Sequence, residues 1–348
     1  MIDVKDILIT PEILQLIAEL DEFKGAWQLL GRLPPDRLNT LREIATMESI
    51  GSSMRMEGSK LSDRKVATLL SRLNGYAFLS HDEQEVAGYG FLCKEIFEKF
   101  ETIPLSETSV KQFHGALLKF SDKNLHYRAE YKKLPNYVEA FNGEGKSLGS
   151  IFETLSPFKV PLKMQELIHQ THEALEAKLL HPLLLIPIFV GEFLVINPFQ
   201  DGNGQLSRIL STLLLLKFGY AYISYGSLEN VMETNRENYY LALKETQQTL
   251  KTNHPNWTPW ILFFLKSMQQ QKLLLEQKIP REKTLTLYLS TLSGNIIKLI
   301  EQHGKLATRE FEIMTKGNRN TIKKHLQKLV SSNKLLRHGK GRATWYTL

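Results

Sequence analysis

The stretch Asn197-Pro198-Phe199-Gln200-Asp201-Gly202-Asn203-Gly204-Gln205-Leu206-Ser207-Arg208 lies between two strongly apolar segments of the chain. Glycines on both sides of Asn203 let backbone amides approach a ligand closely, because glycine has no Cβ atom. A helix expected to begin near Gln205 points the positive end of its dipole at the same place. These features predict a phosphate site, with Asp201 placed for Mg²⁺ and Arg208 as a cation. The alternative is a helix cap that needs glycine for its backbone angles.

Apolar residues recur at three- and four-residue spacing along most of the chain, which predicts amphipathic helices. The pattern is clearest over residues 66–73, 110–120, 164–175, 206–218 and 239–250. Before residue 285, strand-like alternation is found mainly over residues 136–155, where Asn142-Gly143 between two apolar runs predicts a β-hairpin. The expected fold class is therefore mainly α with one small hairpin.

Positive charge is concentrated near the C-terminus. Residues 285–348 contain twelve Lys and Arg against three Asp and Glu, a net charge of +9, whereas the whole chain carries +7 and the remainder therefore −2. A polar segment over residues 268–283, with Pro280 near its end, predicts a linker helix and a domain boundary near residue 283. Expected helices over 294–303, 308–314 and 318–331, followed by a basic hairpin over 335–346, predict a winged helix-turn-helix.

A winged helix-turn-helix would bring DNA to this basic segment. In such modules the third helix enters the major groove and the wing meets phosphates. The expected DNA-binding residues are Arg319, Asn320, Lys323, Lys324, Lys340 and Arg342. The alternatives are a basic surface that is only solvated, or a module that contacts protein instead.

The composition also indicates in which cellular compartment the protein is expected. The one cysteine, Cys93, cannot form an internal disulfide and leaves no thiol cluster for zinc, which favours a reducing compartment. The first six residues include Asp3 and Asp6 where a signal peptide would be basic, and the longest apolar stretch, 179–196, contains two prolines and Glu192. We expect a cytoplasmic protein without a membrane span, built from one large and one small domain.

The stretch at 197–208 resembles the signature His-Pro-Phe-x-Asp-Gly-Asn-Gly-Arg-x-x-Arg of the Fic family of protein adenylyltransferases. Ser53 with Glu57-Gly58 resembles the inhibitory helix motif that some Fic proteins carry upstream of the catalytic core. Residues 136–158 resemble the flap hairpin that aligns a target peptide, and Tyr239-Tyr240 resembles the tyrosine pair beside the adenine. The signature residues that match are Pro198, Phe199, Asp201, Gly202, Asn203, Gly204 and Arg208.

The resemblance implies a Fic-type helical bundle with a β-hairpin flap that uses ATP and Mg²⁺. Its reaction would transfer AMP to a Ser, Thr or Tyr hydroxyl of a target protein, or of the chain itself, and a homodimer is left open. The domains expected are an N-terminal helical region with the inhibitory motif (1–105), a Fic core (106–266), a linker helix (267–283) and the winged helix-turn-helix (284–348).

The resemblance also implies roles for individual residues. Asp201 would hold Mg²⁺, and the inhibitory residues would be Ser53, Glu57 and Gly58, with Glu57 paired to Arg208 so that the γ-phosphate cannot take its productive pose. The nucleotide would contact Glu57, Gly202, Asn203, Gly204, Gln205, Leu206, Ser207, Arg208, Tyr239 and Tyr240. The flap contacts would come from Gly149, Ser150, Ile151 and Phe152.

Two departures from the signature concern the chemistry. Asn197 stands where the family has its catalytic histidine, and an amide cannot accept the proton of the attacking hydroxyl, a loss that costs typically ~10²- to 10⁴-fold in rate. Gln205 stands where the family has its first arginine and removes a fixed charge from the phosphate cradle. No replacement base is evident, because His172 and His181 fit structural positions on apolar helices.

Several interpretations of these departures stay open. The chain is an active enzyme that uses another base, a pseudoenzyme that binds ATP but barely transfers AMP, or a transcriptional or toxin-antitoxin-like regulator whose pocket has decayed. The two substitutions also fit deliberate inactivation. The loss of both a base and a fixed charge favours the nucleotide-binding pseudoenzyme.

Overall fold

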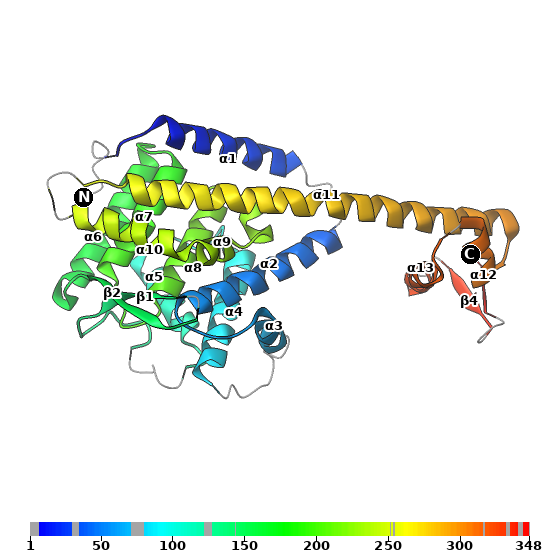
Figure 1. Ribbon diagram of the computed structural model, residues 1–348, viewed down its shortest axis with the longest axis horizontal. Helices are drawn as coiled ribbons and strands as arrows, with labels where there is room; N and C mark the ends of the chain where they lie inside the picture. Colours follow the sequence, from blue (N-terminus) through cyan, green and yellow to red (C-terminus); the bar gives the residue numbers. More distant parts are fainter. Residues whose placement is uncertain are drawn as a thin grey trace. The chain divides into compact units, whose positions relative to one another are not determined.

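The computed structural model describes residues 7–29, 35–70, 80–121, 127–142, 144–250, 252, 255–315, 317–331, 335–339 and 344–347 (Figure 1). The chain divides into two compact units, Met1–Leu275 and Glu276–Leu348. Each unit is described by itself below.

The first unit is a bundle of α-helices with one β-hairpin, which confirms the predicted mainly α fold class. Its helices are α1 (Pro11–Leu29), α2 (Pro35–Met56), α3 (Asp63–Leu70), α4 (His81–Lys99), α5 (Glu107–Leu117), α6 (Val160–Glu176), α7 (Pro182–Ile196), α8 (Asn203–Lys217), α9 (Leu228–Thr234), α10 (Arg236–Thr249) and the first part of α11 (Thr258–His303). Short 3₁₀ turns lie at Pro157–Lys159 and Ala221–Tyr225. Within the described residues, no helix is both long and apolar enough to cross a membrane.

Helix α7 forms the centre of this bundle. Nearly all of its residues are buried, as expected for a helix that is apolar on every face. It packs against α6 on one side and α8 on another, and α8 also contacts α4 and α5. The turn between α7 and α8 is therefore anchored at both ends by buried helices, which gives a site built there a rigid frame.

Helix starts near the site follow local capping chemistry. The side chains of Ser80 and Ser106 accept hydrogen bonds from backbone amides three residues later, at 3.3 Å from the Glu83 nitrogen and 3.1 Å from the Ser109 nitrogen. Such caps satisfy amides that the first turn of a helix leaves without a partner. The caps fix where α4 and α5 begin, and α4 brings its first turn to the site.

The predicted hairpin is present as β1 (Tyr137–Phe141) and β2 (Ser147–Glu153), antiparallel with Tyr137 opposite Glu153. The Asn142 side chain accepts hydrogen bonds from the amides of Glu144 (3.0 Å) and Lys146 (2.8 Å), which closes the turn. Two register irregularities interrupt the pairing. An asparagine that satisfies the turn amides is the reason the local sequence predicts this hairpin.

The second unit combines the C-terminal part of α11 with α12 (Thr308–Thr315) and α13 (Arg319–Ser331). Strands β3 (Leu306–Ala307), β4 (Leu336–His338) and β5 (Trp345–Thr347) form an antiparallel sheet in the order β3-β5-β4. The core of the unit consists of Leu292, Ile296, Ile300, Leu306, Phe311, Ile322, Leu326, Leu329, Leu335 and Tyr346.

One secondary-structure prediction was wrong here. Separate helices were expected over residues 268–283 and 294–303, with Pro280 as the stop signal, but α11 is continuous from Thr258 to His303. A proline is a probable helix boundary and not a certain one, since its neighbours can remain helical where the flanking residues favour a helix.

Candidate functional site

The turn that joins α7 to α8 is held in one conformation by Asn203. Its side-chain oxygen accepts a hydrogen bond from the Phe199 amide (2.9 Å) and its side-chain nitrogen donates to the Phe199 carbonyl (2.7 Å). Gly202 caps α8 with a φ of +73°, a conformation that favours glycine. Both polar atoms of Asn203 thus act on the protein backbone, and the residue shapes the site in addition to lining it.

His114 and Lys132 also hold this turn in place, and no sequence motif predicts either role. The His114 ring stacks on Phe199 at 3.9 Å, and its Nδ1 accepts a hydrogen bond from the Ala129 amide (3.0 Å). Burial lowers the pKa of His114 to about 4, so the neutral ring donates from Nε2 to the Asp201 carbonyl (3.2 Å). The Lys132 ammonium donates to the carbonyl of Ile196 (3.2 Å), at the C-terminal end of α7.

Arg208 is 4% exposed and faces the end of α2. It donates to the Ser53 hydroxyl (2.8 Å), to the Ser53 carbonyl (3.1 Å) and to the Glu57 carboxylate (2.6 Å). Burial disfavours the charged guanidinium, but the Glu57 carboxylate and two nearby tyrosines keep the pKa of Arg208 above its usual value. Ser53 and Glu57 reach it together because residues four apart share one face of a helix.

The Glu57 carboxylate lies directly over the first turn of α8. A Cβ atom added at Gly204 would collide with Glu57 Oε1, so a larger residue there would force this carboxylate to move. The first turn of an α-helix presents backbone amides that attract anions. Glu57 therefore occupies the position where the sequence predicts a phosphate.

A cavity of about 520 Å³ opens beside this contact. Its walls come from the end of α2, the start of α4, strand β1, the α7–α8 turn and the Tyr239–Tyr240 pair on α10. Tyr239 is buried against Trp260, with ring centroids 5.3 Å apart, and the Tyr240 hydroxyl donates to the Met56 carbonyl (3.1 Å). The structure thus brings the C-terminus of α2 and the tyrosine pair to one cavity.

Most residues expected at a nucleotide line this cavity, and a few do not. The lining includes Glu57, Gly58, Asn197, Asp201, Gly202, Asn203, Gly204, Gln205, Arg208, Tyr239 and Tyr240. Leu206 is fully buried in the core, and the Ser207 hydroxyl donates to the Gly204 carbonyl (2.7 Å). The hairpin contributes β1 residues to the lining; Gly149, Ser150, Ile151 and Phe152, predicted as flap contacts to a target peptide, lie on β2 and are not among the lining residues.

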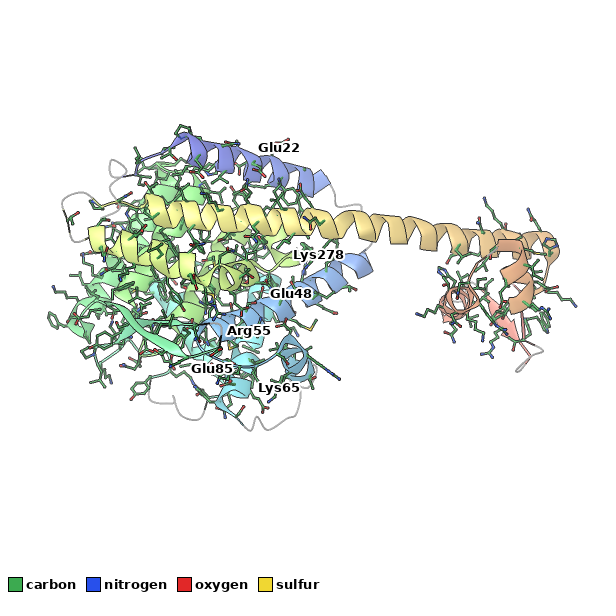
Figure 2. The ribbon with its side chains drawn as sticks, viewed as in Figure 1. Glu22, Glu48, Arg55, Lys65, Glu85 and Lys278 are labelled. Carbon is green, nitrogen blue, oxygen red and sulfur yellow. The ribbon has the colours of Figure 1, made fainter. Side chains whose placement is uncertain are left out.

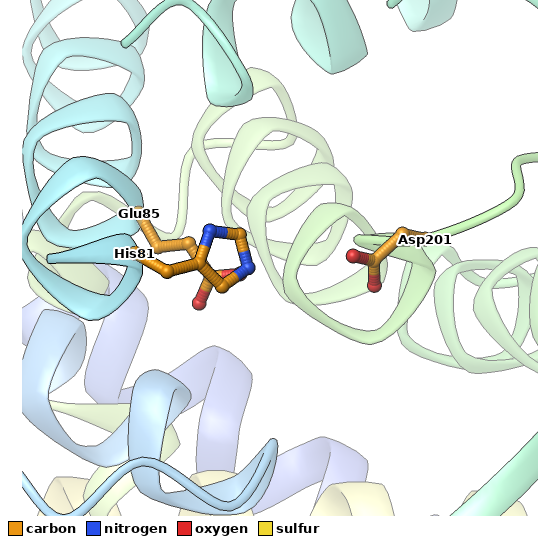
Figure 3. A group of neighbouring side chains, drawn as sticks. All are labelled: His81, Glu85 and Asp201. Atoms are coloured by element: carbon orange, nitrogen blue, oxygen red, sulfur yellow. The ribbon is translucent and has the colours of Figure 1, made fainter. Parts of the chain in front are cut away.

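His81 and Glu85, which the sequence interpretation missed, meet Asp201 at this cavity. One potential ligand atom from each residue lies within 4.8 Å of the other two (Figure 3). His81 Nε2 is 3.0 Å from Glu85 Oε1, and Gln205 Nε2 is 3.4 Å from Glu85 Oε2. Burial, together with the carboxylates of Asp201 and Glu57, raises the pKa of Glu85 to about 8. His-x-x-x-Glu spacing places two side chains on one helix face, but nothing local predicts that Asp201 joins them.

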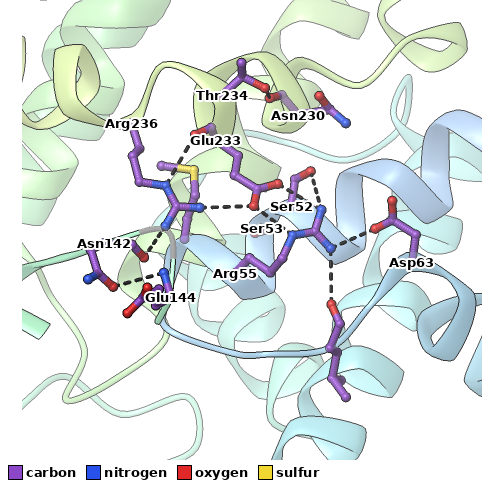
Figure 4. A network of polar contacts seen from close by, with 12 residues as sticks. Ser52, Ser53, Arg55, Asp63, Asn142, Glu144, Asn230, Glu233, Thr234 and Arg236 are labelled. Atoms are coloured by element: carbon purple, nitrogen blue, oxygen red, sulfur yellow. Dashed lines mark hydrogen bonds and ion pairs between the residues drawn. The ribbon is translucent and has the colours of Figure 1, made fainter. Parts of the chain in front are cut away.

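A polar network ties the end of α2 to neighbouring elements. Figure 2 labels Arg55, Lys65 and Glu85, which lie on α2, α3 and α4. Arg55 forms ion pairs with Asp63 (2.7 Å) and Glu233 (2.7 Å). Glu233 also pairs with Arg236 (3.0 Å), whose guanidinium donates to the Asn142 carbonyl in the hairpin turn (Figure 4).

The same turn touches the segment that follows Glu57. A Cβ atom added at Gly145 would lie 2.5 Å from the Gly58 carbonyl oxygen, and one added at Gly58 would lie 3.0 Å from the Phe141 ring. The segment carrying Glu57 and the hairpin are therefore in direct contact.

Four of the six predicted DNA-binding residues lie in the described part of the second unit. Arg319, Asn320, Lys323 and Lys324 are exposed on α13, and Arg319 Nε lies 3.2 Å from Glu312. Lys340 and Arg342, expected on the wing, lie outside the described residues.

Comparisons with known proteins place the middle of the chain in a family context. The sequence model of the Fic/DOC family matches residues 104–215. A curated relative from Aquifex aeolicus, named "Probable protein adenylyltransferase", is 43% identical over 61 residues. That match covers 18% of this chain and 17% of the relative's length.

Solved structures resemble the chain over a greater length. A Fic family protein from Desulfovibrio desulfuricans is similar over 98% of this chain and 97% of that one, with 23% identity and a TM-score of 0.63. A Fic domain containing signaling protein from Bacteroides thetaiotaomicron covers 76% of this chain and 97% of its own, with 20% identity and a TM-score of 0.57. At these identities the likeness shows a shared fold.

Proposed function

We propose that this chain, in which residues 104–215 form a Fic/DOC family domain, binds ATP in the cavity beside the α7–α8 turn and transfers AMP slowly or not at all. The target of any transfer would be a protein hydroxyl. The observation that carries the proposal is the shared cavity: the amide end of α8, Arg208 and the tyrosine pair face one space, while Asn197 stands at the end of α7.

The first turn of α8 would hold the phosphates. Its leading amides have no intrahelical partner, and the helix dipole adds partial positive charge at the same end. Arg208 is the guanidinium closest to that turn in the cavity lining, and Tyr239 and Tyr240 offer ring surface to a base. In this state Glu57 would compete with the terminal phosphate for Arg208.

The donor chemistry at Asp201 fits a magnesium ion. Asp201 is exposed, and its Oδ1 accepts a hydrogen bond from the Gly202 amide at 2.7 Å. Mg²⁺ takes oxygen ligands and is usually held by one or two carboxylates together with substrate phosphates. When bound, the ion would neutralise part of the phosphate charge, and Asp201 would hold it.

Asn197 limits the reaction itself. It is buried at the C-terminal end of α7 with a left-handed φ of 49°, and it lines the cavity. Its amide can orient a hydroxyl by a hydrogen bond but cannot take the proton away. We therefore propose a site that retains nucleotide binding and lacks its general base.

The test is ATP·Mg²⁺ calorimetry on the full chain together with transfer of labelled AMP. The expected result is saturable binding without transfer by the unaltered chain, and transfer by the Asn197→His, Gln205→Arg variant. The control is Asn197→Ala, Gln205→Arg, which restores the charge without an imidazole and should stay inactive. Absence of ATP binding in all three proteins would overturn the proposal.

The second unit supports a separate candidate function, binding of double-stranded DNA. The specific observation is the exposed row Arg319, Asn320, Lys323 and Lys324 on α13, in a segment with a net charge of +9. We propose that residues 284–348 form a winged helix whose α13 approaches the major groove. The chain would then act as a DNA-binding regulator.

Salt dependence tests this candidate. Duplex affinity should fall steeply as salt rises, because neutralised phosphates release counterions. Lys323→Glu with Lys324→Glu should weaken binding about tenfold or more and reduce the salt slope. Lys94→Glu, at an exposed position on α4, is the control and should change neither quantity. Salt-independent binding, or equal loss in the control, contradicts a DNA interface on α13.

A further inference from the structure

The cavity lining is unusually acidic for a site that would receive a polyphosphate. Five carboxylates line it, from Glu57, Asp82, Glu85, Glu139 and Asp201, against the single guanidinium of Arg208. Arg208 is already paired with Glu57. Like charges gathered at a partly buried site repel one another and would also repel a triphosphate. The carboxylates of the lining therefore outnumber its cations, and a bound cation would reduce the repulsion between them.

Gln205 is a neutral residue that contacts one of these carboxylates, Glu85. Its side-chain nitrogen lies 3.4 Å from Oε2 of the half-buried Glu85 carboxylate, so the contact at this oxygen is with an amide dipole and not with a cation. An amide hydrogen bond does not neutralise the carboxylate as a guanidinium would. Glu85 thus faces Asp201 and Glu57 without a fixed cation between them.

His81 adds an imidazole to the same corner, and its geometry suits a ligand. Nε2 contacts Glu85 Oε1 at 3.0 Å, whereas Nδ1 is buried with no hydrogen-bond partner in the described part of the chain. The three ligand atoms of His81, Glu85 and Asp201 lie within 4.8 Å of one another. Around a metal with bonds of ~2.0 to 2.2 Å the ligand atoms would be about 3.4 Å apart, so a rotation of exposed Asp201 would complete the set.

We propose that His81, Glu85 and Asp201 together bind one divalent transition-metal ion, such as Mn²⁺, Co²⁺ or Zn²⁺, in the nucleotide-free protein. An imidazole beside two carboxylates favours these ions over Mg²⁺, which prefers oxygen ligands alone. The ion supplies the positive charge that Gln205 does not. The proposal that a metal ion binds here does not depend on the proposed function. That the ion would lie next to ATP phosphates rests on the proposed function.

The direct test is Co²⁺ titration of the full chain without nucleotide, followed by visible absorption and equilibrium dialysis. We expect one saturable Co²⁺ equivalent that Zn²⁺ displaces and excess Mg²⁺ does not. His81→Ala and Asp201→Asn should each weaken Co²⁺ binding at least tenfold. Circular dichroism checks that each variant is folded, and His81→Gln replaces His81→Ala if the latter is not.

His169→Ala is the matched control. His169 and Glu173 on α6 have the same four-residue spacing and lie 3.4 Å apart, but both are exposed. In the described residues they belong to no three-residue cluster. Co²⁺ affinity should be unchanged in this variant. Equal loss in His169→Ala, or no effect of His81→Ala and Asp201→Asn, overturns the proposed site.

Calorimetry with ATP separates the two proposals. Co²⁺ binding without any ATP binding keeps the metal site and rejects the nucleotide function. ATP·Mg²⁺ binding in a chain that takes up no Co²⁺ rejects the metal site and keeps the function.

Discussion

Arg208 and Glu57 set the state of the cavity at the scale of single residues. The guanidinium is buried and makes three hydrogen bonds to the end of α2, and among the described residues its ion-pair partner is the Glu57 carboxylate. A buried pair of this kind is costly to break from one side, because the remaining charge is left uncompensated. Under the proposed function, a nucleotide phosphate would replace the Glu57 carboxylate as the partner of Arg208 once Glu57 is absent.

Glu57→Gly should therefore strengthen ATP·Mg²⁺ binding, by roughly tenfold or ~1.4 kcal/mol. Calorimetry measures the change, and Glu57→Gln separates charge from bulk because the amide keeps the side-chain volume. Glu139→Gln, another carboxylate of the cavity lining, is the control and should have a smaller effect. Unchanged ATP affinity in Glu57→Gly would show that Glu57 does not block the site.

Asn203 stabilises the conformation of the α7–α8 turn through two side-chain hydrogen bonds. Asn203→Ala leaves the Phe199 amide and carbonyl without their side-chain partner, and unsatisfied buried groups cost about 1 to 3 kcal/mol each. We expect the variant to lose about 2 kcal/mol or more in the free energy of unfolding. Urea denaturation measures this, with Gln200→Ala in the same turn as the control. Equal stability of the two variants would contradict the role of Asn203.

At the scale of elements, α7 is an apolar helix with one carboxylic acid, Glu192. Burial raises the pKa of Glu192 above its usual value. An acid whose folded-state pKa is raised binds its proton more tightly in the folded state. The stability that this proton contributes is fully present below the unfolded-state pKa and is lost as pH rises through the folded-state pKa.

Glu192→Gln should consequently raise the melting temperature near pH 7.5 and have little effect near pH 4. Thermal unfolding across this pH range gives the difference between variant and unaltered chain. Glu176→Gln, at the exposed end of α6, is the control and should show no such pH-dependent gain. A constant difference at every pH would mean that Glu192 is not destabilised by its charge.

The end of α2 and the hairpin form a second pair of coupled elements. Gly58 packs on Phe141, and the chain of ion pairs from Arg55 through Glu233 reaches Arg236 and the Asn142 carbonyl. The hairpin and the segment that carries Glu57 are thus joined by a continuous set of contacts.

At the scale of the whole molecule, the chain consists of two units with separate cores. Phe311 is fully buried in the core of the second unit. Truncating a buried phenylalanine typically costs about 3 to 5 kcal/mol. Separate cores predict that such damage stays within the unit that contains it.

Phe311→Ala should lower the unfolding temperature of the second unit and leave ATP·Mg²⁺ affinity unchanged. Scanning calorimetry resolves the unfolding of the units, and titration calorimetry reports on the cavity. Phe264→Ala, fully buried in the first unit, is the reciprocal control. If Phe311→Ala abolished ATP binding, the two units would not be independent.

Features that depend on neighbours along the chain could be predicted from the sequence. The mainly α class follows from apolar spacing and the hairpin from the turn chemistry of Asn142, whereas the phosphate site expected from Gly202, Gly204 and the start of α8 stays a prediction. A single local signal can mislead where the flanking residues favour another conformation. Pro280 predicts the end of a helix, but α11 continues past it.

Which distant side chains share the cavity depends on tertiary packing. His81 and Asp201 are far apart in sequence, and His114 and Lys132 support the α7–α8 turn from segments that carry no motif. Spacing along a helix fixes which residues share a face, but packing of one helix on another fixes what that face meets. The acidic cavity and its imidazole therefore became visible only when α2, α4 and the α7–α8 turn were placed together.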